Sequence, residues 1–183
     1  MEEPILDYPD LAAWEKWLEA HHGGPTAAWL RIAKKSSGIA SIGPAEAIEV
    51  ALCFGWIDSQ RRKGDDTSYL QRYSRRRPGG SWSKVNVERV ERLIADGRMR
   101  EAGMAEILAA QADGRWDGAY ESQAVATTPP DLEAALAAND RARTAFDALD
   151  RTGRYLLILQ LLKARTDRTR ETRLAKMIAE LAG

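Results

Sequence analysis

The side chains with the greatest chemical potential are concentrated in one basic and aromatic stretch, residues 55–86 (GWIDSQRRKGDDTSYLQRYSRRRPGGSWSKVN). Its core, residues 60–84, holds eight Lys or Arg residues against two Asp. Three consecutive arginines, residues 75–77, can offer forked hydrogen-bond donors to phosphate or carboxylate, with aromatic faces nearby for stacking. The pattern predicts an anion-binding surface. A solvated basic rim neutralised by the acidic residues of segment 1–20 would show the same pattern.

Catalytic candidates are few. Trp56 and Asp58 lie two residues apart in a strand-like run, so their side chains point to the same face. Asp58 could pair with an arginine of the strand that returns beside it, or it could act in acid–base chemistry with Lys84. One carboxylate without a second positioned group is weak support for catalysis. We therefore expect a non-enzymatic protein, with an uncharacterised enzyme that uses Asp58 and Lys84 as the alternative.

The other reactive side chains indicate neither a metal site nor a cofactor. His21 and His22 are adjacent, and adjacent helical residues do not share a face. Cys53 is the only cysteine, which excludes an internal disulfide and a cysteine-based metal cluster. Gly-rich phosphate loops and triad signatures are absent from the sequence. We expect no metal and no cofactor.

One pocket is predicted to gather the aromatic and basic candidates. Its tryptophans would form the walls and its arginines would supply the donors to an unidentified small anionic ligand or a protein partner. The predicted ligand-binding set is Trp56, Asp58, Arg72, Arg75, Arg76, Trp82, Lys84, Asn86, Arg115, Trp116 and Tyr120.

Nucleic acid is a further alternative for a basic hairpin with aromatic residues that could stack on bases. The chain as a whole has 27 basic and 27 acidic residues, so it lacks the positive charge typical of such proteins. Alternate residues of a strand also face opposite sides, which divides the cations between two surfaces. We expect weak binding to nucleic acid at most.

A small antiparallel sheet must position the basic stretch. Residues 28–33 alternate in the way that suits a half-buried strand. Residues 56–63 and 67–75 are strand-like runs that flank Gly64-Asp65-Asp66, and a short Gly/Asp connection of this kind indicates a hairpin. The sequence therefore predicts three antiparallel strands.

Helical patterns account for most of the remaining chain. Asp10, Pro44 and Ser83 are each placed to begin a helix. Four helical segments follow the linker-like residues 121–128, and they predict a small bundle. The predicted class is α+β, mostly helical, with a three-stranded antiparallel sheet in the N-terminal part and a C-terminal helical bundle. The predicted division is an N-terminal α+β domain, 1–122, and a linker with a helical module, 123–183.

Two patterns bear on location. The longest apolar run, Leu156–Leu159 resuming at Leu161, is far too short to span a bilayer. The segment MEEPILDYPD has no basic stretch followed by an apolar one, so it does not have the pattern of a secretory signal. We expect a cytoplasmic protein without a membrane span, and the oligomeric state stays open.

Four motifs in this order, ALCFGWIDSQ, QRYSRRRPGGSWSKVN, GRMREAG and GRWDGAY, resemble the YdeI/OmpD-associated family, also labelled bacteriocin-protection proteins. The similarity extends from about Trp14 to the end. The last 55 residues look like the short helical module that gives the family its name. Ser59 stands where the family commonly has Gly, and Tyr73-Ser74 replace Phe-Thr. The resemblance implies a role in resistance to bacteriocins and antimicrobial peptides, in a stress-related and indirect way, and it carries no known reaction, cofactor or catalytic residue.

Overall fold

The computed structural model of the chain describes residues 3–24 and 27–183. The chain divides into two compact units. Unit 1 comprises Met1–Gly80 and Asn86–Asp117, and unit 2 comprises Ser81–Val85 and Gly118–Gly183. A five-residue segment of unit 2 thus interrupts the sequence of unit 1. The class is α+β, as predicted.

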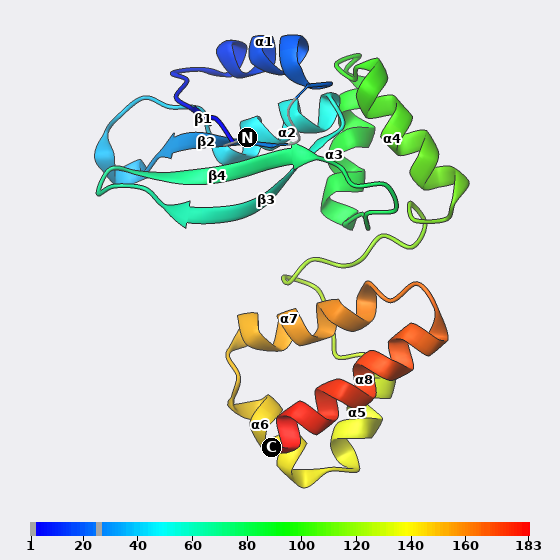
Figure 1. Ribbon diagram of the computed structural model, residues 1–183. Coiled ribbons are helices and arrows are strands. Elements are labelled where there is room, and N and C mark those ends of the chain that lie inside the picture. Colours follow the sequence, from blue (N-terminus) through cyan, green and yellow to red (C-terminus); the bar gives the residue numbers. More distant parts are fainter. Residues whose placement is uncertain (1–2, 25–26) are drawn as a thin grey trace. The chain divides into compact units, whose positions relative to one another are not determined.

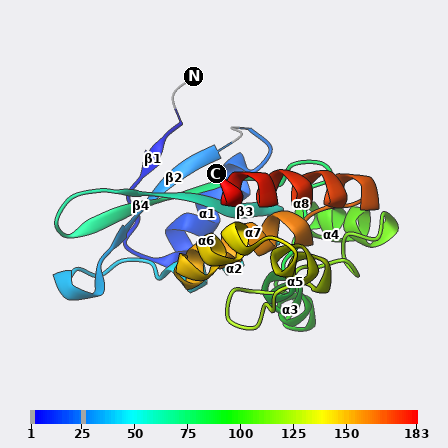
Figure 2. The same cartoon turned by 90° about the horizontal axis from the view of Figure 1, so that it is seen from below.

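A four-stranded mixed sheet lies at the centre of unit 1 (Figure 2). Its strands are β1 (Ile5–Leu6), β2 (Ala27–Ala33), β3 (Trp56–Lys63) and β4 (Ser68–Arg75), in the order β1-β2-β4-β3. Strand β1 is parallel to β2, whereas β2–β4 and β3–β4 are antiparallel. The three predicted strands are present as β2, β3 and β4 with antiparallel pairing, but the prediction missed β1, so the sheet has four strands and is mixed. A two-residue strand is too short to show the alternation by which strands are recognised.

The β3–β4 hairpin is confirmed, and its turn depends on Asp65. The Asp65 carboxylate accepts hydrogen bonds from the amides of Thr67 and Ser68 at 2.9 and 2.7 Å and from both hydroxyls. These bonds hold the pKa of Asp65 well below its usual range. An aspartate that binds backbone amides two and three residues ahead stabilises a turn. The register shifts between Asp58 and Arg61, so β3 contains a bulge.

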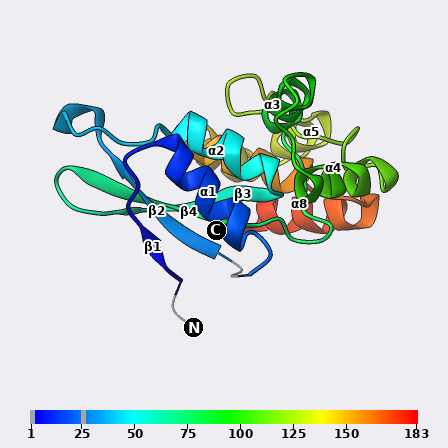
Figure 3. The same ribbon diagram turned by 90° about the horizontal axis from the view of Figure 1, so that it is seen from above.

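Helices α1 (Leu11–His21) and α2 (Pro44–Cys53) lie on the same face of this sheet (Figures 1 and 3). A short 3-10 helix, η1 (Lys35–Ser37), lies between β2 and α2. Asp10 caps α1 by accepting a hydrogen bond from Ala13 N at 2.9 Å, and Pro44 begins α2, both as predicted. The aromatic core joins α1 to the sheet.

That core is built from four aromatic rings. Trp14 stacks on Trp17 at 5.5 Å and meets Tyr73 of β4 at 5.4 Å. Trp56 presents an edge to Trp17 at 5.7 Å, and its indole N–H donates to the carbonyl of His22 at 3.1 Å. Since Trp14 and Trp56 are fully buried, these rings fix the end of α1 against the start of β3.

Helices α3 (Lys84–Ala95) and α4 (Glu101–Ala112) complete unit 1, although the first two residues of α3 belong to unit 2. Helix α4 approaches the end of α2 through Gly103. A Cβ at that position would lie 2.7 Å from the carbonyl oxygen of Leu52 and closer still to that of Cys53. Only glycine permits such an approach, so Gly103 sets how closely α4 packs on α2.

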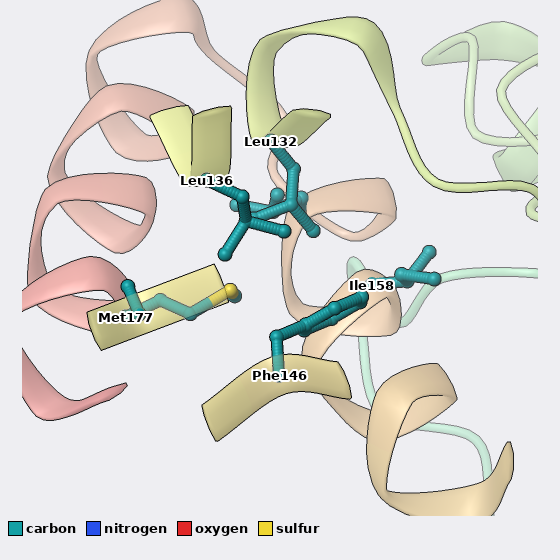
Figure 4. Close-up of a cluster of buried hydrophobic side chains, with 7 residues drawn as sticks. Leu132, Leu136, Phe146, Ile158 and Met177 are labelled. Carbon is teal, nitrogen blue, oxygen red and sulfur yellow. The ribbon is translucent and has the colours of Figure 1, made fainter. Parts of the chain in front are cut away.

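Unit 2 contains four helices around one apolar core, which confirms the predicted helical bundle (Figure 4). The helices are α5 (Pro130–Ala137), α6 (Asp140–Ala148), α7 (Arg151–Leu162) and α8 (Asp167–Ala182). Leucine side chains of α5 meet Phe146 of α6, Ile158 of α7 and Met177 of α8. Outside the core, Asp131 and Arg170 join α5 to α8 by two hydrogen bonds of 2.8 and 2.6 Å. Among residues 3–24 and 27–183, none of the helices has the length and apolar character needed to cross a bilayer.

Candidate functional site

A pocket of about 630 Å³ in unit 1 lies where β4 leaves the sheet. The α1–β2 turn, the α2–β3 junction, the end of β4 and the first turns of α4 all contribute to its wall. Four of its lining residues are arginines, and one is a carboxylate. The lining residues are His22, Gly23, Phe54, Gly55, Arg72, Ser74, Arg75, Arg76, Arg77, Pro78, Ala102 and Glu106.

Arg72 is already engaged by a carboxylate of the same chain. Its Nε and Nη2 donate to the two oxygens of Glu3, and Nη1 donates to Ser59 Oγ at 3.2 Å. The Arg72 guanidinium lowers the pKa of Glu3, as expected for a forked ion pair. Arg72 therefore contributes a neutralised edge to the pocket and is not its principal anion donor.

Arg75 and Arg77 are the cations that remain accessible. Both side chains are exposed, and neither pairs with a carboxylate among the described residues. Within residues 3–24 and 27–183, the one hydrogen bond that the Arg75 guanidinium donates is a long one, 3.4 Å from Nη1 to the carbonyl of Gly23. These two guanidinium groups thus retain most of their donors for a ligand.

The backbone around the pocket is closely fixed. Arg76 N donates to the carbonyl of Gly55 at 3.0 Å, which ties the end of β4 to the start of β3. Gly55 has a φ of +74°, and a Cβ there would lie 3.0 Å from the carbonyl oxygen of Ala102. A side chain at Gly55 would therefore be strained and would press on α4. The arginines project from a braced strand end rather than from a long loop.

Comparison with known families divides the chain. Residues 6–106, more than half of the chain, match the family described as Domain of unknown function (DUF8412). The chain belongs to that family. Residues 125–183 match the family described as Bacteriocin-protection, YdeI or OmpD-Associated, which confirms the resemblance for the C-terminal helical module, whereas the four motifs lie before this match. Searches of curated proteins and of solved structures gave no match. The arginine-lined pocket lies within the DUF8412 match.

Within the DUF8412 match, the structure places Trp56 and Asp58 outside the pocket lining. Trp56 is fully buried in the aromatic core. Asp58 lies opposite Tyr73 in the hairpin, and the residue as a whole is exposed. The surrounding protein atoms still desolvate its carboxyl group and raise its pKa, and the positive charge of Arg89 partly opposes this shift. The expected ion pair between Asp58 and an arginine of β4 was wrong: the described residues contain none, because Arg72 pairs with Glu3.

The cations proposed for nucleic acid are divided between the two faces of the hairpin. Arg61 lies over the ring of Tyr69 at 4.3 Å and donates to Gln71, whereas Arg62 lies over Trp29, also at 4.3 Å. The arginines therefore already cover the ring faces of Tyr69 and Trp29 by cation–π contacts within unit 1. A nucleic-acid role for the hairpin stays a prediction.

The candidates that follow the hairpin have local structural partners. Arg115 is buried, and its guanidinium donates to Asp113 at 2.7 Å and to the carbonyl of Gly80 at 2.9 Å. Arg115 therefore clamps the turn at Gly80 to the end of α4. Asn86 Oδ1 accepts a hydrogen bond from Arg89 at 2.9 Å, and Trp116 N donates to the carbonyl of Ala110 at 3.1 Å.

Three candidates belong to unit 2. Trp82 is buried, and its carbonyl accepts a hydrogen bond from Tyr120 N at 3.0 Å. Lys84 pairs with Glu121, and its amide donates to the carbonyl of Tyr120 at 2.9 Å. Lys163 of the YdeI/OmpD-associated match lies over the Tyr120 ring at 4.9 Å. Lys84 and Asp58 belong to different units, and the acid–base pair stays a hypothesis.

Besides Phe54, which directly precedes the basic stretch, four pocket residues outside residues 55–86 were missed by sequence reasoning, namely His22, Gly23, Ala102 and Glu106. They come from the end of α1, the turn after it and the start of α4, far from the arginines along the chain. Gly23 and His22 were interpreted only as the end of a helix. The signal that could have found them is weak, since it depends on knowing that α1 and α4 both reach the same strand end.

Proposed function

We propose that this protein is a non-enzymatic anion-binding protein that acts in resistance to bacteriocins or related stress. The anion-binding part is supported by one observation above all. Arg75 and Arg77 line a pocket of about 630 Å³ without carboxylate partners among the described residues. The resistance role is supported by the description of the family that residues 125–183 match, which is bacteriocin protection.

A small oxyanion, either a phosphate or a carboxylate, fits this site best. Guanidinium groups match both in geometry and can donate two parallel hydrogen bonds. Glu106 is the only carboxylate among the described residues of the pocket lining, and it sits on the α4 side, away from the strand end that carries the arginines. In the Arg72–Glu3 pair, a guanidinium of this same strand binds a carboxylate by donating two hydrogen bonds in the forked geometry.

Titration calorimetry with inorganic phosphate and with acetate at low ionic strength tests the proposal. Arg75→Gln and Arg77→Gln should each weaken binding by about tenfold, since a hydrogen bond to a charged group contributes about 1.5 kcal/mol. Lys63→Gln is the matched control, because Lys63 is an exposed cation at the far end of the same hairpin and does not line the pocket. An equal loss in Lys63→Gln would show a diffuse charge effect and would refute a specific site.

A further inference from the structure

A second pocket of about 430 Å³ adjoins the arginine-lined one. His22, Phe54 and Ala102 line both pockets, so the two share part of their wall between the end of α1 and the start of α4, and together they are called the cleft. The second pocket is completed by Glu19, Arg100, Glu101 and Ala105. The cleft is described entirely within unit 1.

The two ends of this cleft differ in chemistry. At the second end, the one cation in the lining, Arg100, is paired with Glu15 at 3.0 Å. The apolar part of the wall there is formed by Phe54 and the alanines of α4, beside the carboxylates of Glu19 and Glu101, and the Phe54 ring meets the His22 ring at 5.6 Å. This end has no uncommitted cation for an oxyanion, whereas it offers an apolar and aromatic wall to a hydrocarbon group.

We propose that the cleft binds an amphiphilic anion, with its oxyanion at Arg75 and Arg77 and an apolar or aromatic group against Phe54, Ala102 and Ala105. This proposal rests on the anion-binding function and names the class of ligand for the same site. The polarity of the cleft is directional, because the accessible arginines lie at one end only. A ligand that carries both groups matches that direction, whereas a bare phosphate uses one end alone.

Paired probes separate the two ends. Inorganic phosphate is compared with 2-phenylethyl phosphate, and acetate with 3-phenylpropanoate, so that each pair shares its anionic group and differs by the ring. The ring should tighten binding by about tenfold. This gain is smaller than the gain from burying a phenyl group completely, because the cleft is open to solvent. Whichever pair binds more tightly identifies phosphate or carboxylate as the preferred anion.

Ala105→Trp tests the apolar end. Ala105 is exposed on α4 and lines only the second pocket, so an indole there would fill that end and leave the arginines in place. The variant should lose the tenfold gain from the ring and keep the affinity for inorganic phosphate. Ala112→Trp, an equal substitution at an exposed position two turns further along α4, should bind both probes as the unmodified protein does.

The outcomes distinguish this inference from the proposed function. Arginine-dependent phosphate binding with no gain from the ring, or a gain that Ala105→Trp leaves intact, would overturn the inference alone. Binding of the ring-bearing probes that is indifferent to Arg75→Gln and Arg77→Gln would overturn the proposed function and the inference with it. Phosphoethanolamine, which carries an ammonium group, tests Glu19 and Glu101: a gain there without a gain from the ring would also overturn an apolar ligand.

Discussion

The contact between α4 and α2 through Gly103 predicts a measurable loss of stability when a single methyl group is added. In Gly103→Ala the new Cβ would lie 2.7 Å from the Leu52 carbonyl oxygen. An ordinary carbon–oxygen contact is about 3.3 Å, so α4 must move by at least about 0.6 Å, and by more to clear the closer Cys53 carbonyl oxygen. Overpacking costs about 1–3 kcal/mol, and the upper part of that range, about 2–3 kcal/mol, applies here because the new Cβ meets two backbone carbonyl oxygens.

The helix propensity of alanine offsets part of that cost, since alanine is favoured over glycine inside a helix by about 1 kcal/mol. The expected net loss is about 1–2 kcal/mol in the free energy of unfolding. For a chain of this size it corresponds to a Tm lower by roughly 2–8 °C. Ala102 and Glu106 move with α4, so the affinity for phosphate should fall as well.

Chemical denaturation and differential scanning calorimetry measure the change. Gly23→Ala is the control, because a Cβ there meets nothing within 4 Å, and its stability should stay within about 0.5 kcal/mol of the original. If Gly103→Ala is as stable as the unmodified protein, α4 does not depend on this close approach, and the account of its packing is refuted.

Three further predictions concern single interactions. The Arg170 guanidinium holds the pKa of Asp131 low. The ion pair therefore stabilises the α5–α8 contact above the unfolded pKa of about 3.9, and this stabilisation is lost as the pH falls through the lower folded pKa. Asp131→Asn should make the free energy of unfolding less dependent on pH in this range, as measured by the helical circular dichroism signal. Trp56→Phe removes the indole donor to the His22 carbonyl and should lower the free energy of unfolding by about 1–3 kcal/mol in urea titrations, whereas an unchanged midpoint would contradict a role for that bond. Asp65→Ala should speed amide hydrogen exchange at the β3–β4 turn and leave the four-helix core unchanged, and equal protection in both proteins would count against the turn being held by Asp65.

The hairpin could be predicted because its signal is local. Gly64-Asp65-Asp66 lies between two runs of strand-forming residues, and turn chemistry of this kind acts over a few neighbouring positions. Strand β1 could not be predicted, since Ile5 and Leu6 become a strand only by pairing with β2, more than twenty residues away. The order of the strands depends on such long-range contacts, which no short window contains.

The candidate site was predicted in part for the same reason. The arginines at the end of β4 were identified from their density, and four of them line the pocket: Arg72, Arg75, Arg76 and Arg77, of which Arg77 was not in the predicted ligand-binding set. The tryptophans were expected beside them, but the large apolar area of Trp56 is better buried in the core than exposed in a polar pocket. Arginines that can bind an anion are recognisable from the sequence by residue type. The residues that form the opposite wall of the pocket are brought there by tertiary packing.

Segment Ser81–Val85 has a consequence for the order in which the protein is made. The carbonyl of Trp82 and the amide of Lys84 bond with Tyr120, which is synthesised 38 and 36 residues later. At roughly 5–20 residues per second, the ribosome leaves these groups without that partner for about two to eight seconds. Helix α3 begins at Lys84, so the nascent chain can form most of this helix before its first turn is secured. Residues near Tyr120 thus complete the hydrogen bonding of a segment made earlier, and a chain released before Tyr120 would lack these two hydrogen bonds.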